Sequence, residues 1–580
     1  MKPFWTTFYS YKGGVGRSLA LANTAALLLK RGRRVVLIDF DLEAPGLDSF
    51  EEFKSIAGKP GVVEYVTEFE HTQKAPQITN FIHPCVLENK LRGKLWIMPA
   101  GKKDKHYNVC RSNLNWSRMY ADGWGEPFVE NWKAAIARHC NPDFVFVDSR
   151  TGLTEVGGIC TLHLPDLVVM MFGLNEQNVN GIATVAKTIR ESVVSKLPQI
   201  HYVASPIPNL PRDKKGTLDQ RLVAASERLG IKIQSTIRYQ QIASLNEKLF
   251  VLDKDLVTNP VGQDYQDTIE FEKTSRILSR SPLIQDYADL LESIITYNRI
   301  GLDFLWDQAQ VAISTLDNSL MERLLPVFEE QFDKRPESLM AQAILNRALN
   351  KPEIAERLAH AALETDPTYD FPFRWLLDLY SRNKNSKAGL EICNLVLKHI
   401  EDLSVDRQYD LEIHRGQLAM AAGDYVAADG AYNRTIEYLN KKEKSGEFDP
   451  ETLMIQMFND LESSRRSKQI STSDMWPRVL ELFKMTGDAS TAPLIFQANR
   501  WQAMHVAFAM TGNILKAREA LAKARQAAER LGPTENIFTV MNYTDVPVGD
   551  FLKINEEMLT ALDRGELWDG MKLPNSHDFP

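Results

Sequence analysis

The stretch Tyr9–Ser18, YSYKGGVGRS, combines three glycines with two cations and lies between two segments of different character. Residues 4–10, FWTTFYS, are rich in aromatic and β-branched residues, which is typical of a buried strand. Residues 19–32, LALANTAALLLKRG, contain strong helix formers and end at a glycine. A glycine-rich turn from a strand into a helix points backbone N–H groups and the positive end of the helix at an anion. This stretch therefore predicts a phosphate-binding loop.

The residue types within the loop suit a nucleotide phosphate. Gly13, Gly14 and Gly16 allow the backbone to turn its N–H groups inward around phosphate oxygens. Ser18, at the start of the predicted helix, offers a hydroxyl to Mg²⁺. A plain glycine turn is the alternative, but it would require neither the strand before the loop nor the helix and hydroxyl after it.

The composition describes an ordinary globular protein with more than one domain. The chain has 580 residues, of which 44% are hydrophobic and 25% charged, and its formal net charge is -8. This length predicts two to four domains, and the acidic balance does not favour a protein that coats nucleic acid. The five cysteines lack metal-binding spacing, and no run of about 18 apolar residues occurs. We expect a cytoplasmic protein that does not span a membrane.

Two kinds of pattern divide the chain. Short apolar runs alternate with helical patterns over residues 1–298, whereas residues 299–580 contain mainly long amphipathic helices. The alternation predicts a doubly wound, mostly parallel α/β sheet, and the second pattern predicts an all-α domain. The predicted strands are residues 4–10, 33–41, 94–101, 143–149, 166–173 and 200–208. We therefore expect two domains with their boundary between residues 298 and 299.

The helical part contains internal similarity. Residues 421–439 align with residues 510–528, which places Gly423 on Gly512 and Ala428 on Ala517. Small residues recur at a spacing close to the 34-residue period of tetratricopeptide repeats, where they lie at the closest approach of two helices. We interpret the region as degenerate tetratricopeptide-like repeats, and an irregular helical bundle is the alternative.

Carboxylates follow two of the predicted strands at the point where each strand ends. Asp39 and Asp41 end RRVVLIDFD, and Asp148 lies near the end of DFVFVDS. Because open α/β sheets bind ligands at the carboxyl ends of their strands, we expect these side chains near the phosphate loop. For Asp39 and Asp41, capping of the following loop is the alternative role.

The loop resembles that of a known family. KGGVGRS, Lys12 to Ser18, is similar to the deviant Walker A loop, KGGxGK[ST], of ParA/MinD-type ATPases, and in particular to a variant subgroup in which KGGVGR is the characteristic loop. The resemblance implies a homodimer around two ATP molecules, in which Lys12 reaches the nucleotide of the partner. Arg17 stands where most of the family has lysine, and its planar guanidinium is suited to β- and γ-phosphate oxygens. The implied nucleotide-binding residues are Gly13, Gly14, Val15, Gly16, Arg17, Ser18 and Leu19.

The same resemblance assigns roles to the carboxylates. It places Asp41 in switch I near Mg²⁺ and the attacking water, with Asp39 in support, and it makes Asp148 the Walker B aspartate. Gly152 would then sense the γ-phosphate. The implied metal site is Ser18, Asp39, Asp41 and Asp148, and the implied catalytic residues are Lys12, Arg17, Asp41 and Asp148. Together they describe a Mg²⁺-dependent ATPase whose turnover is slow because of Arg17.

Three other parts of the sequence leave alternatives. Arg150 is either an arginine finger in trans or the partner of a surface salt bridge, and we favour the salt bridge. Glu43 is a weaker candidate for the metal site. Ser205 and Pro206 occupy the region where the family carries an adenine-contacting asparagine, and the guanine-selective NKxD motif is absent from the sequence, which favours ATP.

These features suggest a nucleotide-switched homodimer whose helical repeats bind a protein partner, in a bacterial signalling or anti-phage defence system by analogy of architecture. One alternative is a ParA-like ATPase that positions DNA or cargo. Nucleic acid is not indicated, however, because the cations Arg212, Lys214 and Lys215 form only a short loop in an acidic chain. The other alternative is a pseudo-ATPase scaffold that binds nucleotide.

Overall fold

The computed structural model describes residues 2–87, 91–152, 158–192, 196–209, 215–241, 247–253, 282–444, 449–467, 475–486 and 492–573. The chain forms two compact units, Met1–Thr365 and Asp366–Pro580. The first unit extends past residue 298 and includes part of the segment predicted to be all-α. The domain boundary between residues 298 and 299 stays a prediction. Arg212 and Lys214 lie outside the described residues.

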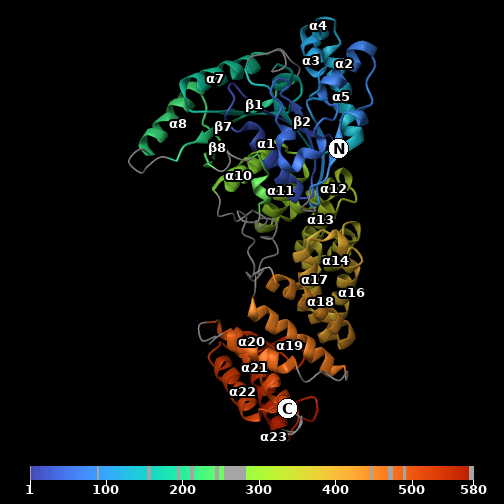
Figure 1. Ribbon diagram of the computed structural model, residues 1–580, viewed down its shortest axis with the longest axis vertical. Helices are drawn as coiled ribbons and strands as arrows, with labels where there is room; N and C mark the ends of the chain where they lie inside the picture. The colour runs from blue at the N-terminus through green and yellow to red at the C-terminus, as the bar shows by residue number, and fades with distance from the viewer. Residues whose placement is uncertain are drawn as a thin grey trace. The chain divides into compact units, whose positions relative to one another are not determined.

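A sheet forms the centre of the first unit (Figure 1). It has eight strands in the order β3-β4-β2-β5-β1-β6-β7-β8. The neighbouring strands are parallel except for β3 and β4. The strands are β1 (Phe4–Ser10), β2 (Arg34–Phe40), β3 (His83–Cys85), β4 (Lys94–Met98), β5 (Phe144–Ser149), β6 (Leu167–Phe172), β7 (Gln199–Ile207) and β8 (Ser235–Arg238). The predicted fold class and all six predicted strands are confirmed. The two strands that the pattern missed, β3 and β8, are short and lie at the edges.

Helices cover both faces of this sheet because the buried strands carry apolar residues on both sides. Phe8 of β1 packs toward α1 and α10, whereas Trp5 and Tyr9 pack toward the opposite face. The opposite face is covered by α2 and α5 near β2 and by α7 and α8 near β7 (Figure 1). The helices described around the sheet are α1 (Arg17–Lys30), α2 (Val62–Thr72), α3 (Tyr107–Asn113), α4 (Trp116–Ala121), α5 (Gly125–Cys140), α7 (Glu176–Arg190), α8 (Lys215–Leu229) and α10 (Pro282–Tyr297).

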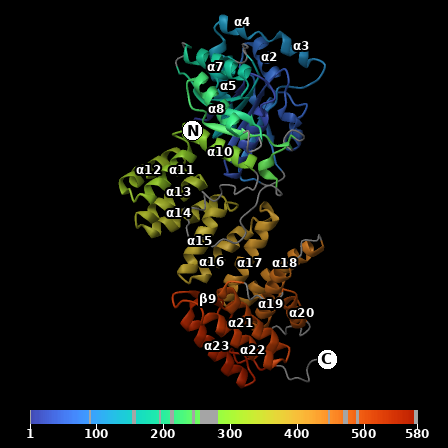
Figure 2. The ribbon, with the colours of Figure 1, turned by 90° about the vertical axis from the view of Figure 1, so that its left-hand side faces the viewer.

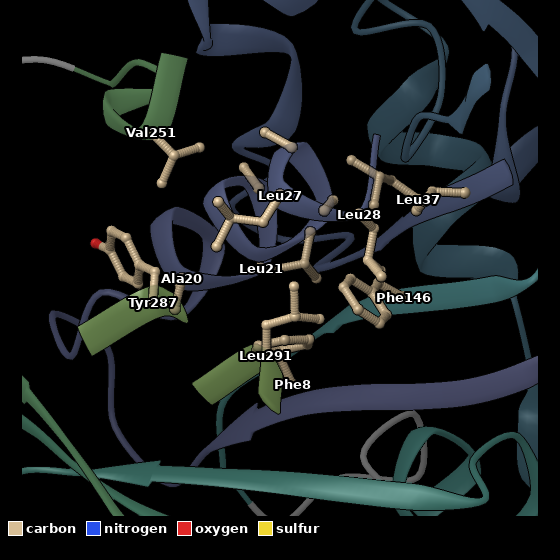
Figure 3. Close-up of a cluster of buried hydrophobic side chains, with 14 of the residues drawn as sticks. Phe8, Ala20, Leu21, Leu27, Leu28, Leu37, Phe146, Val251, Tyr287 and Leu291 are labelled. Carbon is tan, nitrogen blue, oxygen red and sulfur yellow. The ribbon is translucent and has the colours of Figure 1, made fainter. Parts of the chain in front are cut away.

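Helix α1 packs on the sheet beside α10, within one apolar layer. Figure 3 shows Leu21 and Leu28 of α1 among Phe146 of β5 and Leu291 of α10, and all four side chains are fully buried. A helix enclosed in this way by packed side chains has a fixed position relative to the strands. The start of α1, which carries the phosphate loop, is therefore held against the sheet.

A buried network of ion pairs joins the sheet to α11 (Leu302–Ser314) and α13 (Pro336–Ala348), two of the four helices that follow α10. The other two are α12 (Asn318–Gln331) and α14 (Pro352–Thr365). Arg33, just before β2, donates from Nε to Asp303 Oδ2 of α11 at 2.8 Å. Arg92 donates to Glu337 Oε1 of α13 at 2.8 Å. Gly32 lies beside Glu337, and a Cβ atom at this glycine would lie 2.6 Å from Glu337 Oε1. These contacts place α11 and α13 in the same compact unit as the sheet.

The second unit consists mainly of helices that pack on their neighbours in chain order (Figure 2). They are α15 (Asp370–Arg382), α16 (Ser386–Leu397), α17 (Val405–Ala422), α18 (Tyr425–Lys444), α19 (Pro450–Arg466), α20 (Met475–Met485), α21 (Leu494–Met510), α22 (Ile514–Ala528) and α23 (Val548–Asp563). One exception to the all-α expectation is an antiparallel hairpin of β9 (Asn536–Thr539) and β10 (Thr544–Pro547). Short turns of 3-10 or π helix in the two units are η1 (Leu47–Ser49), η2 (Glu51–Ile56), η3 (Ile78–Asn80), η4 (Ile159–His163), η7 (Phe250–Leu252) and η8 (Ile400–Asp402).

The aligned stretches of the second unit share a local conformation. Gly423 separates α17 from α18 with φ 79°, and Gly512 separates α21 from α22 with φ 77°. Ala428 and Ala517, which follow them, are both buried. The tetratricopeptide interpretation itself stays a prediction. Among the helices that the structure describes, none is long and apolar enough to cross a membrane.

Candidate nucleotide-binding site

The predicted site lies at the carboxyl ends of three adjacent strands. The phosphate loop follows β1, Asp39 and Asp41 lie at the end of β2, and Asp148 lies near the end of β5. The strand order β2-β5-β1 and the register place Asp148 beside both Asp39 and Phe8. Topology alone therefore brings the loop and the predicted carboxylates to one edge of the sheet.

The loop has the conformation that phosphate binding requires. Gly14 and Gly16 have φ of 79° and 77°, in the left-handed region, and Gly16 is the N-cap of α1. A side chain at these positions would strain the backbone, which explains the glycines. Ser205 of β7 donates its hydroxyl to the carbonyl oxygen of Val15 at 2.8 Å and so ties the loop to the sheet. Lys12 is exposed at the start of the loop.

Arg17 is buried between the two carboxylates. Its Nε donates to Asp148 Oδ1 at 2.5 Å, and its Nη2 donates to Asp41 Oδ2 at 2.8 Å. A third bond, from Nη1 to Ser10 Oγ, is 3.3 Å long. Burial alone would lower the pKa of Arg17, but the Asp148 and Asp41 carboxylates outweigh that effect and raise it. The structure thus brings together Arg17, Asp41 and Asp148 in an ion-pair arrangement that the sequence pattern did not indicate.

The other two residues of the predicted metal site contact the same group. Ser18 donates its hydroxyl to Asp148 Oδ2 at 2.5 Å. Asp39 accepts backbone N–H bonds from Asp41, Gly46 and Leu47 at 3.1–3.2 Å. Burial, reinforced by the charge of Asp148, raises the pKa of Asp39 to about 8. The hydrogen bonds of Asp39 hold the loop after β2, and its place in the metal site stays a prediction.

The donors at this edge fit a magnesium ion that is completed by phosphate. No group of three or more His, Cys, Asp or Glu side chains in the described parts of the chain is arranged to hold a metal ion by itself. Mg²⁺ in nucleotide sites, however, takes only one or two carboxylates from the protein and fills its octahedral shell with water and phosphate oxygens. Ser18, Asp41 and Asp148 supply a hydroxyl and two carboxylates of that kind.

Further contacts hold the segments that follow β2 and β5. Arg150 pairs with Glu43 at 2.6 Å, which confirms the expected salt bridge, and Arg111 of α3 lies 3.3 Å from the other oxygen of Glu43. The hydroxyl of Tyr9 donates to the carbonyl oxygen of Gly152 at 3.1 Å. Tyr107 donates its hydroxyl to the carbonyl oxygen of Leu42 at 2.8 Å. Sequence reasoning missed Tyr107 and Arg111, because no motif spacing connects them with the loop, and it assigned no role to Ser10 within the quoted stretch.

Comparisons with known proteins agree with this geometry. The family model described as CobQ/CobB/MinD/ParA nucleotide binding domain matches residues 6–355, which is more than half of the chain. Among curated protein sequences, none matches the chain significantly.

Several solved structures are similar to part of the chain. One is the cell division ATPase MinD of Pyrococcus furiosus, with 14% identity, a TM-score of 0.35, and coverage of 51% of this chain and 99% of that one. Another is the ATP complex of a variant of Cyanothece McdA, with 12% identity, a TM-score of 0.36 and coverage of 51% and 97%. A third is a plasmid partition protein from Borrelia burgdorferi, with 15% identity, a TM-score of 0.34 and coverage of 51% and 99%. The family match shows that the chain belongs to the CobQ/CobB/MinD/ParA nucleotide-binding domain family.

Proposed function

We propose that this protein is an ATP-dependent switch. ATP and Mg²⁺ bind at the loop of residues 12–18, two copies associate across the bound nucleotides, and slow hydrolysis separates them. The helical repeats bind a protein partner, so that the nucleotide controls an assembly in the cytoplasm. A role in bacterial signalling or antiviral defence is the proposed setting, and its support is the joining of an ATPase to a repeat array.

One observation carries this proposal. A loop with left-handed glycines enters α1 at the carboxyl edge of a parallel sheet, and Asp41 and Asp148 lie within ion-pair distance of the first residue of that helix. Backbone N–H groups, a helix N-terminus and an arginine together provide the positive potential that a triphosphate requires. The two carboxylates provide the complementary groups for a metal ion.

The residues of this chain would divide the work of phosphoryl transfer. Arg17 binds β- and γ-phosphate oxygens, and Lys12, which is exposed, reaches the nucleotide of the second copy. Asp41 orients the attacking water, and Asp148 and Ser18 hold the metal shell. Bound Mg²⁺ supplies charge neutralisation on the phosphate oxygens. Binding and orientation rather than covalent chemistry then account for the catalysis.

The experiment that tests nucleotide binding compares two glycines with the same backbone conformation. Gly16→Ala strains the loop at φ 77°, whereas Gly230→Ala strains a turn after α8 at φ 65°. A Cβ atom at Gly230 would meet no atom within 4 Å, so strain is the effect that the two changes share. We expect Gly16→Ala to weaken the binding of a fluorescent ATP analogue more than tenfold and Gly230→Ala to leave it unchanged. Equal affinity in Gly16→Ala and the unaltered protein would refute the proposal.

A second candidate is a nucleotide-binding scaffold with negligible turnover. The observation in its favour is that Arg17 and Ser18 both bond Asp148, so the groups needed for catalysis bind one another. A single-turnover assay with labelled ATP, combined with sizing in ATP and in ADP, separates the two candidates. A dimer that forms in ATP and dissociates as phosphate is released supports the switch, and a stable dimer without phosphate release supports the scaffold.

A further inference from the structure

Three nitrogens of Arg17 each bind a different group at the carboxyl edge of the sheet. The acceptors belong to Asp148, Asp41 and Ser10, at 2.5, 2.8 and 3.3 Å. They lie in or directly after the three adjacent strands β5, β2 and β1. A lysine has its three donors on one nitrogen, whereas the guanidinium spreads its donors over a planar fork. The bridge over three strands is therefore a consequence of having arginine at this position.

The carboxylates in this bridge are the same ones that are proposed to hold Mg²⁺. Both oxygens of Asp148 are engaged, Oδ1 by Arg17 and Oδ2 by the hydroxyl of Ser18. Asp41 offers Oδ2 to Arg17 and Oδ1 to the backbone N–H of Ala44 at 3.4 Å. The Arg17 side chain is only 8% exposed, so water screens its charge weakly. A metal ion that approaches these oxygens must compete with a cation already bound to them.

We propose that Arg17 is an internal counter-cation of the metal site, which neutralises Asp41 and Asp148 until the phosphates of a nucleotide draw its guanidinium into the loop. This inference rests on the proposed nucleotide binding. Arg17 begins α1 directly after the loop, so a change in its own side-chain rotamer exchanges carboxylate oxygens for phosphate oxygens. Both kinds of oxygen suit the bidentate fork of arginine. The two carboxylates then become available to Mg²⁺.

The exchange makes metal and nucleotide binding interdependent. Because each ligand favours the arrangement in which Arg17 has left the carboxylates, each raises the affinity of the other by the same factor. Without nucleotide, the metal binds weakly, since it must displace the guanidinium. Removal of the guanidinium is therefore expected to strengthen metal binding, which is the opposite of what the loss of a merely supporting residue would do.

The test uses Mn²⁺ as the probe, with free Mn²⁺ measured by electron paramagnetic resonance on the full chain. Without nucleotide, Arg17→Gln is expected to bind Mn²⁺ at least tenfold more tightly than the unaltered protein. The matched control is Arg150→Gln, which removes an arginine that pairs with Glu43 at the same edge of the sheet. Its affinity for Mn²⁺ is expected to change less than threefold. An unchanged affinity in Arg17→Gln, or an equal gain in Arg150→Gln, overturns the proposal.

A second variant keeps the test decisive if Arg17→Gln does not fold. Arg17→Met also removes the guanidinium, and its apolar side chain suits a buried position. Without nucleotide it is expected to bind Mn²⁺ at least tenfold more tightly than the unaltered protein, and an unchanged affinity overturns the proposal. ADP binding is measured separately in EDTA. If the unaltered protein binds no ADP, the proposed function fails, whereas the nucleotide-free comparison of Arg17→Gln with the unaltered protein still tests Arg17.

Discussion

Helix α1 has a buried arginine beside each end, and the two have different surroundings. Arg33, beyond the last turn, lies in a network of paired charges. The ion pairs of this network join Arg31, Arg33, Arg92 and Arg335 with Glu292, Asp303, Glu337 and Asp143. Arg17, at the first turn, bridges Asp41 and Asp148 with Asp39 close by, so carboxylates outnumber cations there.

This difference in surroundings distinguishes a structural ion-pair network, at Arg33, from the predicted ligand site, at Arg17. Burial would lower the pKa of Arg33, but Asp303 and Glu337 raise it well above its ordinary value, and Arg33 and Arg31 hold the pKa of Asp303 low against the effect of burial. Every charge named in this network has an opposite partner, so an added ion would disturb it. At Arg17 we expect both an additional cation and an anion to bind, because two carboxylates face one arginine and the glycine loop lies beside them.

The largest effect is expected from breaking the ion-pair network around Arg33. Asp303→Asn leaves Arg33 buried without its main counter-charge, so it should lower the free energy of unfolding of the first unit by about 3–5 kcal/mol. Urea denaturation followed by tryptophan fluorescence measures this change. The matched control is Asp41→Asn, because Asp148 still pairs with Arg17 and the loss of one carboxylate relieves repulsion among the rest. Its expected cost is about 1 kcal/mol or less, and an equal loss in both variants would contradict the comparison.

The next effect concerns turnover. Asp41→Asn removes the carboxylate that is proposed to orient water, and ATP hydrolysis should fall about 10²-fold while nucleotide binding persists. Since hydrolysis is proposed to separate the copies, a dimer should accumulate in ATP and Mg²⁺, as measured by sizing with light scattering. A variant that remains monomeric in excess ATP would show that the switch mechanism is wrong.

A smaller effect is expected from Lys12, the exposed cation of the loop. Lys12→Ala should raise the dissociation constant of the ATP-bound dimer about tenfold, because the side chain is proposed to contact the nucleotide of the other copy. Nucleotide affinity of the monomer should change much less. Lys94→Ala, an exposed lysine at the start of β4, serves as the control in analytical ultracentrifugation. If nucleotide affinity falls more than dimer affinity, Lys12 acts within its own copy.

The smallest effect is expected at the surface pair of Arg150 and Glu43. Their side chains are 29% and 46% exposed, so solvent screens the interaction. Arg150→Ala should lower the free energy of unfolding by about 0–1 kcal/mol, and it should leave ATP hydrolysis unchanged. A drop in hydrolysis without a change in stability would restore Arg150 as a catalytic arginine.

The sequence was most informative where the pattern is local. Continuous apolar runs predicted the six central strands, and the glycine spacing predicted the loop, because each depends on residues that are close in the chain. The bond between Arg17 and Asp148 joins residues 131 positions apart, and the bond between Arg33 and Asp303 joins residues 270 positions apart. Charged residues are common throughout the chain, so nothing in their spacing distinguishes such partners. Edge strand β3 was missed for a different reason: its three residues, with a proline in the middle, carry no strand pattern.

That same strand limits how copies of the protein can associate. The exposed Pro84 at the centre of β3 cannot donate a backbone hydrogen bond outward, and at the opposite border Asp286 accepts the backbone N–H of Arg238 in β8. Each border therefore has one position at which a backbone N–H is missing or already bonded. Growth of the sheet from one molecule into the next is thereby disfavoured, and self-assembly is directed to loops and helix surfaces, which a small ligand can rearrange.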